Sequence, residues 1–107
     1  MKIRTSSIAD VDVAEAALWL EQQQSSLGAA FLEAVDKTFA QIVSRPLACP
    51  TFVSSKFTFK SPLRSAAIGT FEYRAIFIVQ ADEVQVVAVW HAHRDLDTIL
   101  SARVGVK

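Results

Sequence analysis

The stretch from Tyr73 to His93, YRAIFIVQADEVQVVAVWHAH, decides the fold. Two apolar runs, residues 73–80 and 84–90, are rich in β-branched and aromatic side chains, which favour strands. The short turn at residues 81–83 separates them, and strands joined by so short a turn pair as an antiparallel hairpin. The stretch therefore predicts two core strands, the second of which ends in polar, titratable side chains.

Three further segments upstream have the character of extended chain. Residues 63–71, LRSAAIGTF, predict a strand just before the hairpin, and residues 1–9, MKIRTSSIA, predict a short first strand. Between Pro46 and Pro62, the segment KFTFK at residues 56–60 alternates aromatic and polar side chains. We expect it to form a short strand or an extended arm.

Helical patterns occupy the region before Pro46. The first helix is expected from an N-cap at Asp10 to about Gln24, and the second from Leu27 to Ser44, where the residue before a proline leaves the α region. Because the connection between them is short, the two should form an antiparallel hairpin. A short final helix is expected over residues 96–104.

Helices early in the chain and strands late in the chain predict an α+β fold. We expect an N-terminal short strand, an antiparallel helical hairpin packed on a mostly antiparallel four-stranded sheet, and a short C-terminal helix. The 107 residues are enough for one core, so residues 1–107 are predicted to be a single domain.

The first helix carries two apolar stripes on nearly opposite sides. One stripe consists of Val11, Ala14 and Leu18. The second consists of Val13, Ala16 and Leu20, with Trp19 near it. Either the sheet and the second helix cover both stripes, or a second polypeptide covers one of them. The candidate partner contacts are Val13, Ala16, Trp19 and Leu20.

Charge and cysteine content restrict the classes of function that we expect. Lysine plus arginine equals aspartate plus glutamate, at 11 each, so a strongly basic nucleic-acid binder is not indicated. The half after residue 55 is slightly basic, which leaves room for a local basic patch. Cys49 is the only cysteine, so no internal disulfide forms, as expected in a reducing cytosol. No apolar leader or membrane-length apolar run is present, so we expect a cytoplasmic chain.

Several segments together carry a family resemblance. The second helix opens with Leu27, Gly28 and Phe31, and the strands carry Arg64, IGTFEYR at residues 68–74 and VWHAHRD at residues 89–95. In this order and spacing they resemble the ParE/RelE superfamily, the toxins of bacterial type II toxin–antitoxin (plasmid stabilisation) systems, over nearly the whole chain. The resemblance implies a small cytosolic toxin held inactive by a cognate antitoxin, with no cofactor. Arg64 joins the candidate partner contacts.

The superfamily divides by target. RelE-like members cleave mRNA in the ribosomal A site without a metal, and ParE-like members poison DNA gyrase. By resemblance, Arg74 and Arg94 match two arginines of the nuclease set. Its two lysine positions fall on Ser65 and Ala67, and its tyrosine falls on Leu100, none of which can replace them. The ParE-like branch is therefore favoured, and RNA cleavage, or loss of toxicity with partner binding kept, remain the alternatives.

Two histidines keep the nuclease alternative open. His91 and His93 are two apart, so they are expected to share a strand face with Val87 and Val89. Imidazoles exchange protons near neutral pH, and Arg94 would add a cation. The plainer interpretation is the solvated end of a buried strand, with Arg94 paired to Asp95, Asp97 or a chain terminus. The two histidines would supply only half a zinc site, so no metal site is predicted.

Overall fold

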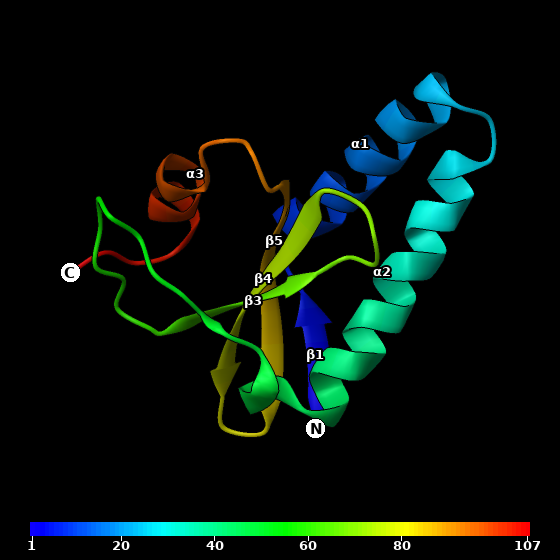
Figure 1. Ribbon diagram of the computed structural model, residues 1–107. Helices are drawn as coiled ribbons and strands as arrows, with labels where there is room; N and C mark the ends of the chain where they lie inside the picture. The colour runs from blue at the N-terminus through cyan, green and yellow to red at the C-terminus, as the bar shows by residue number, and fades with distance from the viewer.

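The computed structural model describes residues 1–107 and contains five strands and three α-helices (Figure 1). The predicted α+β architecture is confirmed, except that the sheet has five strands rather than four. In chain order the elements are β1 (Lys2–Thr5), α1 (Ser7–Gln23), α2 (Leu27–Ser44), the 3-10 turn η1 (Pro46–Ala48), β2 (Thr51–Phe52), β3 (Leu63–Ala67), β4 (Tyr73–Gln80), β5 (Glu83–His91) and α3 (Leu96–Arg103).

The sheet has the strand order β1-β5-β4-β3-β2, and only the β1–β5 pair is parallel. The hairpin predicted from residues 73–93 forms its centre, with Gln80 opposite Glu83. A β-bulge interrupts this hairpin, because Ile76 lies opposite Ala88 whereas Phe77 lies opposite Val86. Val87 is thus an extra residue on β5, and such an insertion shifts the faces of all the residues that follow it.

The fifth strand is the short edge strand β2, which pairs antiparallel with β3. It occupies the free edge of β3, and the predicted strand at residues 56–60 does not join the sheet. That segment is an extended arm held by the C-terminal residues. Phe59 makes a single bridge with Val106, and the backbone N–H of Lys60 donates to the carbonyl of Gly105 at 2.8 Å.

The α1–α2 hairpin covers one face of the sheet, and α3 covers the other (Figure 1). Alternation along β4 divides its side chains between two cores. Tyr73, Ala75 and Phe77 join the hairpin-side core, which also contains Phe31 and Val86. Ile76 and Ile78 join the α3-side core, which also contains Leu63, Leu96 and Leu100.

The start of α1 differs from the prediction. The helix begins at Ser7 rather than after Asp10, because the hydroxyl of Ser6 accepts a hydrogen bond from the backbone N–H of Ala9 at 3.1 Å. The backbone N–H of Ser6 also donates to the carbonyl of Val86, so the end of β1 sets this start. The predicted bounds of α2 are confirmed, and α3 ends one residue earlier than expected.

One apolar stripe of α1 is buried and the other is exposed. Ala16 and Leu20 are buried in the hairpin-side core, and Val13 packs against it. Burial removes Ala16 and Leu20 from the accessible partner contacts, so the intramolecular alternative holds for them. The open apolar face of α1, called the α1 stripe below, consists of Ile8, Val11, Leu18 and Trp19, with exposed fractions of 51%, 53%, 62% and 49%. None of the three helices combines the length and apolar character needed to cross a membrane.

Candidate functional site

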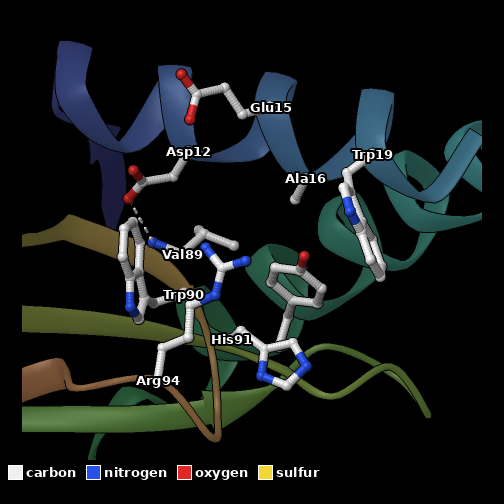
Figure 2. A pocket seen from close by; sticks show the side chains of 9 residues that line it. Asp12, Glu15, Ala16, Trp19, Val89, Trp90, His91 and Arg94 are labelled. Atoms are coloured by element: carbon white, nitrogen blue, oxygen red, sulfur yellow. Dashed lines mark hydrogen bonds between the residues drawn. The ribbon is translucent and has the colours of Figure 1, made fainter. Parts of the chain in front are cut away.

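Cavities lined by the candidate residues lie between α1 and the C-terminal end of β5 (Figure 2). β1 ends at Thr5, opposite Val86, so beyond this point α1 rather than a strand covers the outer edge of β5. Two cavities of about 180 and 250 Å³ share the side chains of Trp19, Tyr73, His91 and Arg94. We treat them as one site, called the α1–β5 cavity below.

A buried ion pair closes one end of this cavity. The guanidinium of Arg103 donates to both carboxylate oxygens of Asp12, at 2.6 and 2.9 Å, and to the carbonyl of Val87 at 3.1 Å. The backbone N–H of Val89 donates to the same carboxylate at 3.0 Å. Asp12 and Arg103 thereby satisfy the backbone groups that β1 leaves unpaired on β5, and they join α1 to α3.

The wall of the cavity on the β4 side is aromatic. Tyr73 lies opposite His91 in the strand register, with their rings edge to face at 5.2 Å. The ring of Phe31 packs behind Tyr73 at 5.1 Å, which fixes the phenol against the core. Trp19 faces the cavity from α1 and also belongs to the α1 stripe (Figure 2). The cavity is therefore continuous with the open apolar face of α1.

Both predicted histidines stand at the mouth of the cavity, around one carboxylate. The backbone N–H of His93 donates to Nδ1 of His91 at 3.1 Å, so the proton of a neutral His91 lies on Nε2. That Nε2 is 3.6 Å from one oxygen of Glu72, and Nε2 of His93 is 3.7 Å from the other. Glu72 was not among the predicted site residues.

Arg94 is an unpaired cation in this cavity. Its backbone N–H donates to the carbonyl of His91, but its side chain makes neither a hydrogen bond nor an ion pair (Figure 2). The expectation that it pairs with Asp95, Asp97 or a chain terminus is wrong. Asp95 instead accepts from Thr98 and lies 3.9 Å from the amine of Lys56.

Arg74 does not join the other candidates. It alternates with Tyr73 along β4, so its side chain lies on the α3 side of the sheet, where its Nε donates to the hydroxyl of Ser65. Leu100, at the position of the nuclease tyrosine, is fully buried under the same face. The structure therefore brings His91, His93 and Arg94 together and places Arg74 across the sheet from them.

The bulge at Val87 explains which residues meet. Counted from the turn without a bulge, Tyr73 would face Trp90, and Val87 and Val89 would share the face of His91. In the structure Val89 and His91 lie on the hairpin side, and Val87 lies on the α3 side, so the expected grouping is wrong for Val87. No signal in the sequence marks this bulge, and the Tyr73–His91 contact was missed for that reason.

Arg64 lies elsewhere, on β3. Its guanidinium donates to the carbonyl of Cys49 at 2.6 Å and to that of Leu47 at 3.4 Å, which holds the segment after α2 against the sheet. Arg64 therefore has the contacts of a residue that anchors a loop. Cys49 is a partly buried free thiol, and no group of three or more His, Cys, Asp or Glu side chains is arranged to hold a metal ion.

The α1–β5 cavity thus combines a free guanidinium, two imidazoles beside a carboxylate, a phenol and an indole. Such a set suits recognition of a polar or anionic group flanked by apolar contacts. A comparison with curated proteins found no match. The sequence profile of the ParE toxin of type II toxin-antitoxin system, parDE, matches residues 3–96, which include both long helices and, apart from Lys2 of β1, all five strands. The chain belongs to the ParE toxin family.

Proposed function

We propose that this chain is a toxin that acts by binding a protein, DNA gyrase, and that a cognate antitoxin neutralises it by covering the α1 stripe. Membership of the ParE toxin family supports the assignment to a type II toxin–antitoxin system. The choice of a protein target over RNA cleavage is supported by one observation above all, the separation of Arg74 from Arg94 by the sheet.

RNA cleavage through the 2′-hydroxyl needs a base, an acid and cations around one phosphate. The residues on the α1 side offer two histidines and one unpaired arginine, beside the acidic side chain of Glu72. The residues on the α3 side offer Arg74 with Ser65, above a buried Leu100. On the α1 side only one free cation stands beside the two histidines, and on the α3 side no group can exchange a proton at the position of Leu100, which favours inhibition by binding.

The α1 stripe supports an antitoxin contact. At about 100° per residue, its four side chains fall within about 100° of one another around the helix. Clustered large apolar groups of this kind mark protein interfaces, and an amphipathic segment of a partner is the common way to cover them. The proposed contact residues are Ile8, Val11, Leu18 and Trp19, which replace the buried part of the predicted set.

Expression in bacteria tests the proposal. The chain expressed alone should arrest growth, and co-expression with the product of the neighbouring reading frame should restore it. The purified chain should inhibit supercoiling by DNA gyrase, and that product should relieve the inhibition. Discrete mRNA cleavage sites in primer extension, with gyrase unaffected, would replace the proposal with the RelE-like alternative. Harmless expression with partner binding kept would indicate a non-toxic member.

A charge substitution tests the contact surface. Leu18→Glu should weaken the complex with the neighbouring product at least tenfold, because it places a charge inside an apolar contact. Leu47→Glu is the matched control, since Leu47 is exposed to a similar degree but lies in η1, away from α1. Isothermal titration calorimetry measures both. Equal affinity for the two variants would rule out the α1 stripe as the antitoxin contact.

A further inference from the structure

Arg94 provides the starting observation, because it is a guanidinium without a protein partner beside two aromatic side chains. Figure 2 shows it between α1 and β5, below Asp12, and Tyr73 lines the same cavity. A guanidinium is more weakly hydrated than an ammonium, and its planar set of N–H donors can bind a carboxylate with two parallel hydrogen bonds.

The carboxylates around Arg94 either pair with other side chains or point away from it. Asp12 is neutralised by Arg103. Glu72 lies between the two histidines. Figure 2 shows the carboxylate of Glu15 directed away from Arg94, and no ion pair joins them. Arg94 is exposed and has no counter-charge within the chain, so it is available to bind an anionic group of another molecule.

The place of the cavity indicates the source of that charge. Trp19 lies both in the α1 stripe and in the wall of the cavity, so whatever covers the stripe also reaches the cavity mouth. A polypeptide that lies along α1 with apolar side chains toward Val11 and Leu18 would bring its next side chains over Arg94. A phosphate group alone would leave the apolar side chains of the α1 stripe uncovered. This favours a protein over a nucleic acid as the partner here.

We propose that the α1–β5 cavity receives an aspartate or glutamate side chain of the partner whose apolar residues cover the α1 stripe. The carboxylate binds the guanidinium of Arg94 beside Trp19 and Tyr73, and the partner's apolar residues reduce the access of water and so strengthen the ion pair. Binding then requires an acidic residue of the partner at a fixed distance from the apolar residues that contact α1. This requirement discriminates among related partners. The inference rests on the proposed antitoxin contact.

The test measures the affinity of the full chain for the purified product of the neighbouring reading frame. Arg94→Glu should weaken the complex by roughly 30-fold or more, because it removes the pairing cation and sets two carboxylates against each other. Arg45→Glu makes the same charge change on an exposed residue at the end of α2 and should change the affinity less than about threefold. Circular dichroism establishes that both variants are folded.

A second set of variants identifies the carboxylate. Each aspartate and glutamate of the partner segment is changed to lysine and measured against the chain with Arg94→Glu. One such change should restore binding to that variant and weaken binding to the unchanged chain. Restoration by no single change would overturn the inference, and so would unchanged affinity of Arg94→Glu. If Arg94→Glu instead lost binding to a single-stranded oligonucleotide and kept that protein, the cavity would be a phosphate site.

The two proposals fail in different ways. If the unchanged chain does not bind the neighbouring product, the proposed antitoxin contact falls and the inference falls with it. If the unchanged chain binds and Arg94→Glu binds equally well, the antitoxin contact stands and only the carboxylate site is lost.

Discussion

Asp12 shows at the scale of one residue how far environment departs from local pattern. In the sequence it lies near the start of a helix, where the helix dipole stabilises any acidic side chain. In the structure it is 4% exposed and holds Arg103, which is 13% exposed, 91 positions away in the chain. A buried carboxylate is tolerated only with its hydrogen bonds made, and Asp12 accepts from Arg103 and from the backbone of Val89.

Removing Asp12 should therefore be costly. Asp12→Ala leaves the guanidinium of Arg103 and the N–H of Val89 without their acceptor, and we expect it to lower the free energy of unfolding by about 3–5 kcal/mol. The double variant Asp12→Leu with Arg103→Met should lose less than Asp12→Ala, because it leaves no buried charge. Urea unfolding measures these differences.

The control for this experiment is Asp36→Ala, on the exposed side of α2. It should change the free energy of unfolding by no more than about 0.5 kcal/mol. An Asp12→Ala variant as stable as Asp36→Ala would mean that the ion pair contributes nothing to the attachment of α3.

At the scale of elements, α3 depends on its cap. The helix has only eight residues and is too short to be stable by itself. The carboxylate of Asp95 accepts from the hydroxyl of Thr98 at 2.7 Å and from its backbone N–H at 3.2 Å. Leu96 and Leu100 then bury the inner face of the helix against β4 and β5.

The cap makes the stability of α3 depend on pH. The hydrogen bonds from the side chain and then the backbone of Thr98 lower the pKa of Asp95 below the ordinary aspartate value. A pKa lower in the folded than in the unfolded chain stabilises the fold above the unfolded pKa, and this support is lost as the pH falls through the folded value. Protection of the Thr98 amide from hydrogen exchange should therefore decrease when the pH is lowered below about 4.

Substitution of the cap separates this effect from general acid unfolding. Asp95→Asn should keep a capped α3 without this acid dependence, since an amide accepts the same bond and does not titrate. Asp97→Asn, two residues further on, should keep the wild-type response of Thr98. Identical acid responses in all three proteins would contradict the assignment to Asp95.

At the scale of the whole molecule, one sheet separates two cores. The hairpin-side core and the α3-side core share β4 and β5, so neither should survive the loss of the other. Each side also carries one tryptophan, Trp19 on α1 and Trp90 against the α3-side core. The chain thus has a natural optical probe on each face.

Unfolding should therefore be a single transition. Single-tryptophan proteins made with Trp19→Phe or Trp90→Phe should each show the same urea midpoint by fluorescence and by circular dichroism. Phe31→Ala on one side and Leu100→Ala on the other should each cost about 2–5 kcal/mol and move both signals together. Signals from Trp90 that change before those from helix content would mean that α3 and its core unfold separately.

Much of the architecture follows from local chemistry. The β4–β5 hairpin follows from two apolar runs and a short turn, and the end of α2 follows from Pro46. The first strand and the final helix follow from similar patterns. What local pattern missed was the start of α1, where Ser6 rather than Asp10 is the cap, and the strand β2, whose two residues are too few to leave a pattern.

The candidate site was predictable only in part. His91, His93 and Arg94 are adjacent in the chain, so their proximity needed no tertiary information. Glu72 and Tyr73 reach them only across the hairpin, through a register that the bulge at Val87 shifts by one residue. Arg74 was grouped with them by resemblance, and the alternation of β4 places it on the other face.

By itself, then, the sequence determined the α+β class, the order of the main elements and the family resemblance, because hydrophobic periodicity and turn residues act over short distances. Only the tertiary structure decided which stripe of α1 is covered, which face of the sheet each polar side chain occupies and that Asp12 meets Arg103. These outcomes depend on strand register and on contacts between residues far apart in the chain, where one inserted residue reverses every face beyond it.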